Sequence, residues 1–239
     1  VNLDATGNVN LDATGDGGDL IIETERLRLV DGAQVATITA GSGNGGTLRV
    51  QAQEIELIGT SDLGASGLLA NAIAGTGDGG KLEVNTDQLM IRDGATISVS
   101  NFQSNNRQEP GLGEAGDIEI VANSIQLSNS GADTANGGGI TASNFSAGGG
   151  NIDISANKIT SNRGQITATS DLSGGGDIKI ISDLLFLSNQ STISTSVNDS
   201  TGGGGDIKIN SDFVVVVDQS NITANAIFGT GGNINITTQ

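Results

Sequence analysis

The side chains in this chain that could do chemistry are carboxylates and a few cations. Asp and Glu number 27 and Lys and Arg number 10, whereas His and Cys are absent. Polysaccharide lyases and hydrolases with acidic clusters remain conceivable without a histidine base or a thiol nucleophile. However, Glu83, Glu119, Asp153, Lys179 and Lys208 recur at intervals of 26 to 36 residues with mixed signs. This mixture predicts a solvated acidic face, so we predict no catalytic residues and no enzyme activity.

The excess of acid also limits the ions and partners that this chain can bind. A formal net charge of −17 repels nucleic acid and anionic lipid surfaces. No stretch approaches the roughly 20 apolar residues of a membrane span. Divalent cations would relieve repulsion among the carboxylates, so we expect diffuse or weak Ca²⁺ binding. The calcium-binding G-G-x-G-x-D repeat is absent, because the run from Gly202 to Asp206 has the wrong spacing. We therefore predict no cofactor, no defined metal site, no nucleic-acid partner and no membrane insertion.

An internal repeat sets the elements that must position these side chains. A glycine pair, once an Ala-Gly pair, precedes a short segment of alternating apolar residues throughout the chain. The copies start at residues 17, 45, 79, 115, 149, 175, 204 and 231, and residues 1–16 form a partial copy. Insertions near 58–66, 103–114 and 130–138 account for the longer copies.

Each copy contains three short segments in which apolar and polar residues alternate, a pattern typical of strands with one buried face. In the copy that starts at residue 175, the three segments are 178–180, 185–187 and 193–196. Such short strands become stable when each pairs in parallel with its counterpart one repeat later. The sequence therefore predicts a single all-β domain over 1–239, a right-handed three-sided parallel β-helix with one coil per repeat of 26 to 36 residues.

Glycines and polar residues are predicted to build the corners of the coils. Glycine is expected to provide positive φ and close backbone approach where one coil leads into the next. The glycines in question are Gly18, Gly46, Gly80, Gly116, Gly150, Gly176, Gly205 and Gly232. A polar column between the first and second strands includes Asn123, Asn157, Asp183 and Asp212. A second column, after the second strand, consists of Asp31, Asp93, Asn129, Asn162, Asn189 and Asp218. Because stacked amides and carboxylates bond turn amides, a structural role is predicted for both columns.

With these columns, the chain resembles the β-helix repeats of filamentous-haemagglutinin-like bacterial exoproteins, which are exported by two-partner secretion. The resemblance is closest to the cyanobacterial surface-protein type and covers essentially 1–239. It rests on the G-G-[DN]-I-x-I starts, such as 149–154 and 175–180, on the middle segment 89–98, and on third strands such as 140–143. It implies a secreted, cell-surface or matrix protein that serves adhesion or scaffolding.

Two further features are candidates for partner binding. The insertion at 103–114 contains Arg107, Glu109 and Pro110, and it is the most distinctive loop of the chain. Solenoids often bind partners through such projecting loops, although simple loop variation explains it as well. The third strands carry two files of Ser and Thr, which resemble an ice-binding face but favour a hydroxyl ladder that stabilises the sheet. The files are Ser98, Thr141, Thr167, Ser194 and Thr223, and Ser100, Ser143, Thr169, Ser196 and Asn225.

Together these features predict a non-catalytic, structural and adhesive segment of an extracellular fibre. A polysaccharide lyase or hydrolase and an ice-binding solenoid remain the alternatives. Because both ends of the sequence lie within the repeat pattern, we expect the solenoid to continue beyond them. Its expected partners are cell-surface or matrix components, the rest of a parent chain, or copies of itself stacked end to end.

Overall fold

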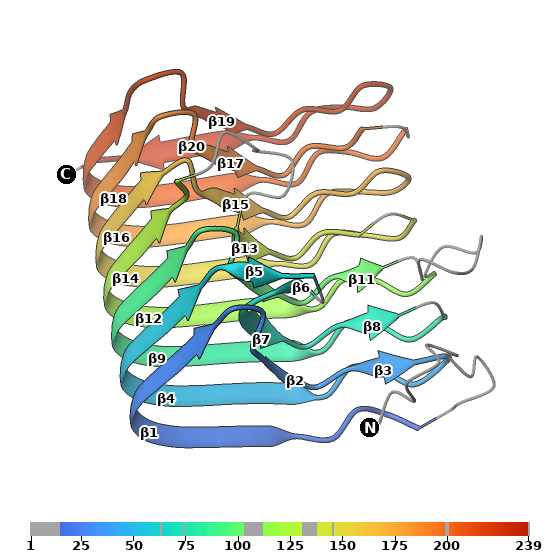
Figure 1. The fold of residues 1–239 in the computed structure, drawn as a ribbon. Helices are drawn as coiled ribbons and strands as arrows, with labels where there is room; N and C mark the ends of the chain where they lie inside the picture. Colours follow the sequence, from blue (N-terminus) through green and yellow to red (C-terminus); the bar gives the residue numbers. More distant parts are fainter. Residues whose placement is uncertain are drawn as a thin grey trace.

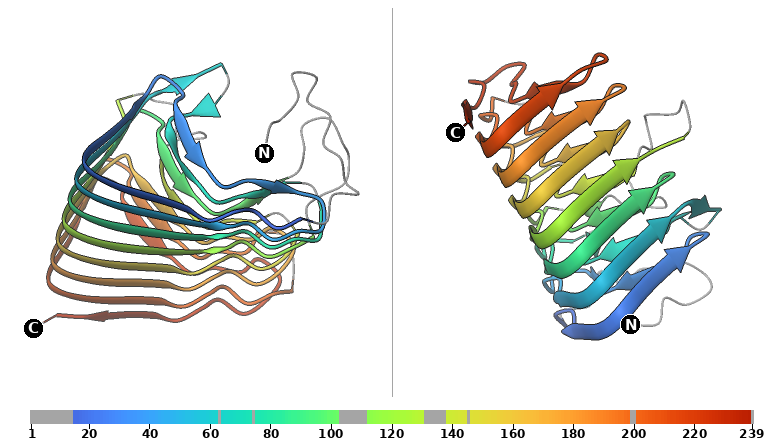
Figure 2. Two further views of the ribbon diagram at one scale, coloured as in Figure 1. Left: turned by 90° about the horizontal axis from the view of Figure 1, so that it is seen from below. Right: turned by 90° about the vertical axis from the view of Figure 1, so that its left-hand side faces the viewer.

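The computed structural model describes residues 15–62, 64–73, 75–102, 112–130, 138–144, 146–198 and 201–238. These residues form twenty strands and no helix, and each coil lies directly on the one before it (Figure 1). Seen from the first coil, the chain turns clockwise as it recedes, so the winding is right-handed (Figure 2, left). The predicted all-β parallel β-helix is confirmed. We number its coils one to eight from the starts given above.

The largest sheet takes one strand from every coil. All eight strands are parallel and follow one another in sequence order. Equivalent residues are paired, so Ile120 pairs with Ile154, which pairs with Ile180. The strands are β1 (Leu20–Val30), β4 (Thr47–Ile58), β9 (Lys81–Arg92), β12 (Asp117–Ser128), β14 (Ile152–Asn162), β16 (Ile178–Ser188), β18 (Ile207–Val216) and β20 (Ile234–Thr237).

The first and second predicted strands of a coil are one continuous strand with a bend, contrary to the expectation of two strands and a connecting turn. β16 runs unbroken through both predicted segments. Its pairing with β14 skips only Asn157 and Asp183, at the bend. An extended chain can turn this corner by giving up one pair of the ladder, so no loop is needed. The bend divides the sheet into a first face, before the polar column, and a second face, after it (Figure 2, right).

A second parallel sheet forms the third face of the coil. Its seven strands contain three residues each and correspond to the predicted third strands. They are β2 (Gln34–Ala36), β7 (Gly67–Leu69), β10 (Thr96–Ser98), β13 (Gly139–Thr141), β15 (Gln165–Thr167), β17 (Thr192–Ser194) and β19 (Asn221–Thr223).

Tight turns connect the second and third faces at the second polar column. In four coils the N–H of the fourth turn residue donates to the carbonyl of the first, as from Ala95 to Arg92 at 3.1 Å. Both central residues have positive φ, 54° at Asp93 and 88° at Gly94. Such turns favour Asp, Asn and Gly, which explains Asp31, Asp93, Asn189 and Asp218 of the polar column.

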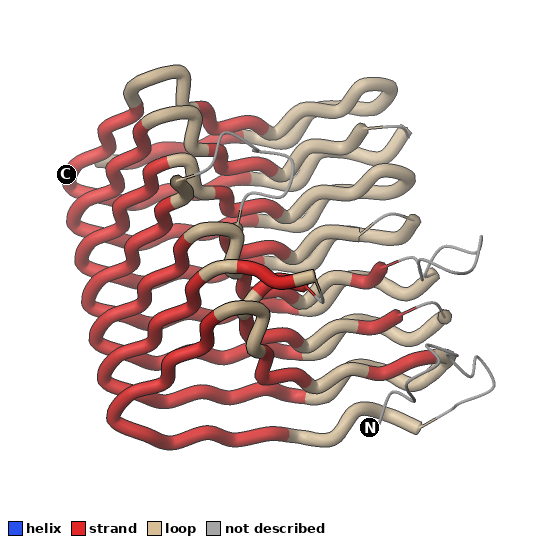
Figure 3. Tube along the Cα trace, in the orientation of Figure 1, coloured by secondary structure: helices blue, strands red, loops and turns tan. Residues whose placement is uncertain are grey.

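After the third face, coils one to seven each extend into an arm that was not predicted from the sequence (Figures 1 and 3). In the early coils the outgoing legs pair as β3 (Thr39–Ala40), β8 (Ala72–Ile73) and β11 (Asn101–Phe102). Single parallel bridges through Asn144, Ser170, Val197 and Ala226 continue this ladder. The base of six arms is closed by a hydrogen bond from the second residue of the following glycine pair, as from Gly150 N–H to the Ala142 carbonyl at 2.8 Å.

One insertion also forms structure of its own. Residues 58–66 contain a short antiparallel hairpin of β5 (Thr60–Ser61) and β6 (Gly64–Ala65). Most of the insertions near 103–114 and 130–138 lies outside the described residues.

Aliphatic side chains of the three faces fill the interior in columns. Leu48, Leu82, Ile118, Ile152 and Ile178 form one such column, and each is at most 1% exposed. Burying a side chain of this size contributes roughly 1.5–3 kcal/mol, so the repeated columns dominate the stability of the fold.

The glycine pairs allow the coils to approach closely at the entrance to the first face. A Cβ on Gly150 would overlap the carbonyl oxygen of Gly116, and a Cβ on Gly116 would overlap that of Gly80. None of the described second glycines of the pairs has positive φ. The expected close approach is therefore confirmed, whereas the expected left-handed backbone is wrong for these glycines and occurs instead at the turns after the second face.

Candidate functional site

A ladder of carboxylates and amides joins successive coils immediately after the glycine pairs. Asp117 Oδ1 accepts the backbone N–H of Asn151 at 3.0 Å, and Asn151 Oδ1 accepts that of Asp177 at 3.0 Å. Asp177 Oδ1 then accepts the N–H of Asp206 at 2.8 Å. Finally, Asp206 Oδ1 accepts both the backbone N–H and Nδ2 of Asn233, at 2.8 and 3.0 Å. These side chains therefore satisfy backbone donors of the next coil.

The hydrogen bonds at the end of this ladder favour the ionised form of Asp206. The backbone and side-chain donors of Asn233 lower the pKa of Asp206, and the nearby charge of Lys208 acts in the same direction. The recurrent Asp or Asn after the glycine pair is visible in the sequence, but its bonding role was not predicted. The signal was present, because only short acceptor side chains can reach the adjacent backbone at this position.

A second ladder of the same kind lies just before the glycine pairs of the early coils. The backbone N–H of Asn44 donates to Asp16 at 2.8 Å, that of Asp78 to Asn44 at 3.0 Å, and that of Glu114 to Asp78 at 2.8 Å. The first three arms therefore return beside an acceptor side chain supplied by the preceding repeat. The two ladders bracket the glycine pairs, where the backbones approach most closely.

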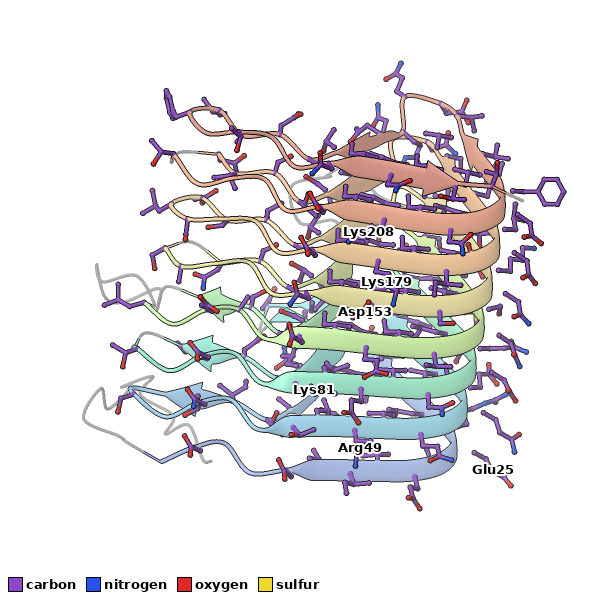
Figure 4. The ribbon with its side chains drawn as sticks, turned by 180° about the vertical axis from the view of Figure 1, so that it is seen from behind. Glu25, Arg49, Lys81, Asp153, Lys179 and Lys208 are labelled. Carbon is purple, nitrogen blue, oxygen red and sulfur yellow. The ribbon has the colours of Figure 1, made fainter. Side chains whose placement is uncertain are left out.

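The predicted polar column lies at the bend of the long strands, where Glu25 occupies the equivalent position in the first coil (Figure 4). Asn123 Nδ2 donates to Asp87 Oδ1 at 2.9 Å across one coil boundary. Asn157, Asp183 and Asp212 are exposed on the same edge. The small residues immediately before this column point inward and are buried, among them Ala52, Thr86, Ala122, Ala156, Ser182 and Ser211.

Charged side chains gather on the outer side of the first face, where Figure 4 shows Arg49, Lys81, Asp153, Lys179 and Lys208. In coils two to four they form a network. Arg49 Nε is 2.6 Å from Glu83 Oε2, and Lys81 Nζ is 2.7 Å from Glu83 Oε1. Lys81 also lies 3.4 Å from Glu119. The network borders a shallow depression of about 320 Å³.

This network has the residue types that a carbohydrate-cleaving site needs, but its carboxylate Glu83 is held in stable ion pairs. Hydrogen bonds from Arg49 and Lys81 lower the pKa of Glu83 to about 2. The same bonds raise the pKa of Lys81 and of Arg49. A carboxylate with this pKa is a weak base and holds no proton at neutral pH, which suits it poorly to acid–base catalysis.

A second depression, of about 400 Å³, lies along the bend of coils one to three. Outward carboxylates and amides line it in two files, Glu23, Gln51 and Asn85 in one and Glu25, Gln53 and Asp87 in the other. Among the described residues, no group of three or more acidic side chains has a geometry that could hold a metal ion.

The two Ser and Thr files lie where the third face meets the arms, and they bond to one another. The hydroxyl of Thr167 donates to that of Thr141 at 3.2 Å, and Thr169 donates to Ser143 at 2.9 Å. Ser98 and Ser100 are at most 2% exposed. The arrangement matches the hydroxyl ladder favoured in the sequence analysis, because these groups satisfy one another within the sheet.

The remaining predicted site lies in a part of the chain without described structure. Arg107, Glu109 and Pro110 all lie outside the described residues. Across the segments that are described, no helix is long and apolar enough to cross a membrane.

Comparison with protein families, curated proteins and solved structures found no match to this chain.

Proposed function

We propose that this chain is a structural and adhesive segment of a secreted fibre at a bacterial cell surface or in its matrix, without catalytic activity. The observation that carries the proposal is the hydrogen-bonded ladder from Asp117 to Asn233. Its polar side chains form hydrogen bonds from each coil to the next. This regular column on the surface therefore stabilises the stacking of coils into a long, rigid rod. The proposed location and export rest on the resemblance to filamentous-haemagglutinin-like repeats.

The adhesive role is tested with beads coated with the folded protein. In flow, these beads should be retained on bacterial cell layers or on purified extracellular matrix more strongly than beads coated with heat-denatured protein. Equal retention of the two kinds of beads would contradict adhesion by the folded rod.

The absence of catalysis is tested on a panel of acidic polysaccharides, with and without Ca²⁺. We expect no release of unsaturated or reducing ends. Release that disappears in a Glu83→Gln variant would instead establish an enzyme that uses the network on the first face. Thermal hysteresis at micromolar protein would establish the ice-binding alternative.

A further inference from the structure

The outward residues of the second face change character from the first coils to the last. Each long strand of coils one to seven presents two outward side chains after its bend, and register places these pairs one above another. From coil one to coil seven, the pairs are Arg26 and Arg28, Glu54 and Glu56, Gln88 and Met90, Ser124 and Gln126, Lys158 and Thr160, Leu184 and Phe186, and Phe213 and Val215. The first two pairs are entirely charged, whereas the last two pairs are entirely apolar.

Leu184, Phe186, Phe213 and Val215 form one contiguous surface, which we call the apolar patch. Leu184 pairs with Phe213, and Phe186 pairs with Val215. Phe213 is 68% exposed, and Leu184, Phe186 and Val215 are half-buried. Paired strands lie about 4.8 Å apart and alternate residues about 7 Å apart, so the four side chains form a compact cluster. Leu185 and Leu187, the inward residues of β16 between and beyond the patch residues, belong to the core, so the outward residues of this strand have no structural task inside the coil.

Carboxylates border the apolar patch on two sides. Asp183 and Asp212 are exposed at the bend, and Asp218 is exposed at the turn beyond the second face. One cation is adjacent, because Lys158 pairs with Leu184 from the coil below. The border is therefore predominantly negative, as is the whole chain.

The shape of the apolar patch and the charge of its border favour one kind of binding partner over others. A second copy placed face to face would bring its own acidic border against this one, which is unfavourable. A sugar ring needs a flat aromatic platform, whereas Leu184 and Val215 are branched and uneven. A polypeptide can pack aliphatic side chains between the rings and place Lys or Arg beside the carboxylates. An amphipathic helix, about 10 Å across, has the width of the patch.

We propose that the apolar patch and its acidic border bind a cationic amphipathic polypeptide segment. The apolar side chains of the segment cover Phe186 and Phe213, and its Lys or Arg residues lie beside Asp183 and Asp212. This interaction is additional to the fibre role proposed above and does not depend on it.

The probe is a fluorescent 18-residue amphipathic peptide of Leu and Lys, titrated with the full chain and followed by anisotropy. The test variant is Phe186→Thr with Phe213→Ser, which introduces the residue types of coils five and four at these positions. The matched control is Ile181→Ser, because Ile181 is a 43% exposed apolar residue of the same coil on the first face. All three proteins carry the same net charge, so general attraction to a cationic peptide is constant.

We expect the double variant to weaken binding at least tenfold, and Ile181→Ser to leave it within twofold. A peptide with Glu in place of Lys should bind at least tenfold more weakly to the unchanged protein. The proposal is overturned if the double variant binds as tightly as the unchanged protein, or if the Glu peptide equals the Lys peptide. Self-association of the chain that requires Phe186 and Phe213, seen by sedimentation, would overturn it in favour of a second copy. Circular dichroism of each variant establishes that the coils remain folded.

Discussion

At the scale of the residue, the direction of each side chain decides its role. Lys179 and Ile180 are neighbours in β16, yet Lys179 is exposed to solvent and Ile180 is fully buried. Every coil repeats this alternation, so an inward substitution disturbs a column that runs through the molecule. A substituted outward side chain contacts only neighbouring side chains on the surface, so it disturbs the fold less.

Ile180→Asp should unfold the middle of the rod. The substitution places an unpaired charge in a closed apolar column, and we expect it to lower the free energy of unfolding by about 4 kcal/mol or more. Lys179→Asp should change it by less than about 0.5 kcal/mol, because Lys179 is exposed and lies a full 4.0 Å from Asp153. Urea denaturation followed by circular dichroism measures both. Equal losses would show that the inward and outward positions are misassigned.

The ion pairs of Glu83 should make the free energy of unfolding depend on pH. Because the pKa of Glu83 is lowered from 4.5 to about 2 in the fold, its ionised form stabilises the folded state above pH 4.5. This contribution is lost as the pH falls toward 2, and we expect a decrease of at most about 1 kcal/mol because the pairs are partly solvated. The measurement is the free energy of unfolding between pH 5 and about 2.

Glu83→Gln is the variant that isolates this effect. This substitution should remove part of the decrease in the free energy of unfolding between pH 4.5 and about 2. In about 1 M NaCl the difference between the two proteins should shrink, because salt screens exposed pairs. An identical pH profile for both proteins in low salt would mean that Glu83 does not stabilise the fold through its charge.

At the scale of the element, the connections between strands are governed by backbone contact. Long strands bend without a loop at the polar column, turn through left-handed residues such as Asp93 and Gly94, and meet the next coil at the glycine pairs. The three corners therefore have different physical requirements, although all three contain small or polar residues.

Gly150→Ala should be much more harmful than Gly148→Ala. The new Cβ at Gly150 would overlap the backbone of Gly116, whereas the nearest atom to a Cβ at Gly148 is the side chain of Glu114 at 3.6 Å. We expect a loss of about 1–3 kcal/mol for Gly150→Ala and a smaller change for Gly148→Ala. Thermal and urea unfolding of the two variants provide the comparison. Similar losses of stability in the two variants would show that the backbone flexibility of glycine, and not close packing between coils, is the cause.

At the scale of the whole molecule, the rod is a stack in which each coil contacts mainly its immediate neighbours. Stability is then the sum of individual coils and the interfaces between them. The core columns are closed in the middle of the stack, while all four residues of β20 are exposed.

Amide hydrogen exchange should be slowest in the middle coils and fastest in the outer coils. We expect the slowest exchange in β9, β12, β14 and β16, and exchange at least tenfold faster in β1 and β20, because each outer coil lacks one neighbour. Mass spectrometry of peptic fragments gives the rates. Uniform protection along the rod would indicate a single cooperative unit instead of a stack of coupled coils.

The sequence by itself determined the repeat, the parallel stacking and the inward columns. A period-2 pattern that recurs at fixed positions, such as Ile152 and Ile178, has one efficient way to bury its apolar face. Only the tertiary structure decided how the corners are made and what the outward residues meet. The bend at Asp183, the arms, the ladder through Asp206 and the apolar patch around Phe213 all depend on contacts between residues almost 30 positions apart. Local patterns specify which side faces the core, but the stacking of one coil on the next decides the chemistry of the surface.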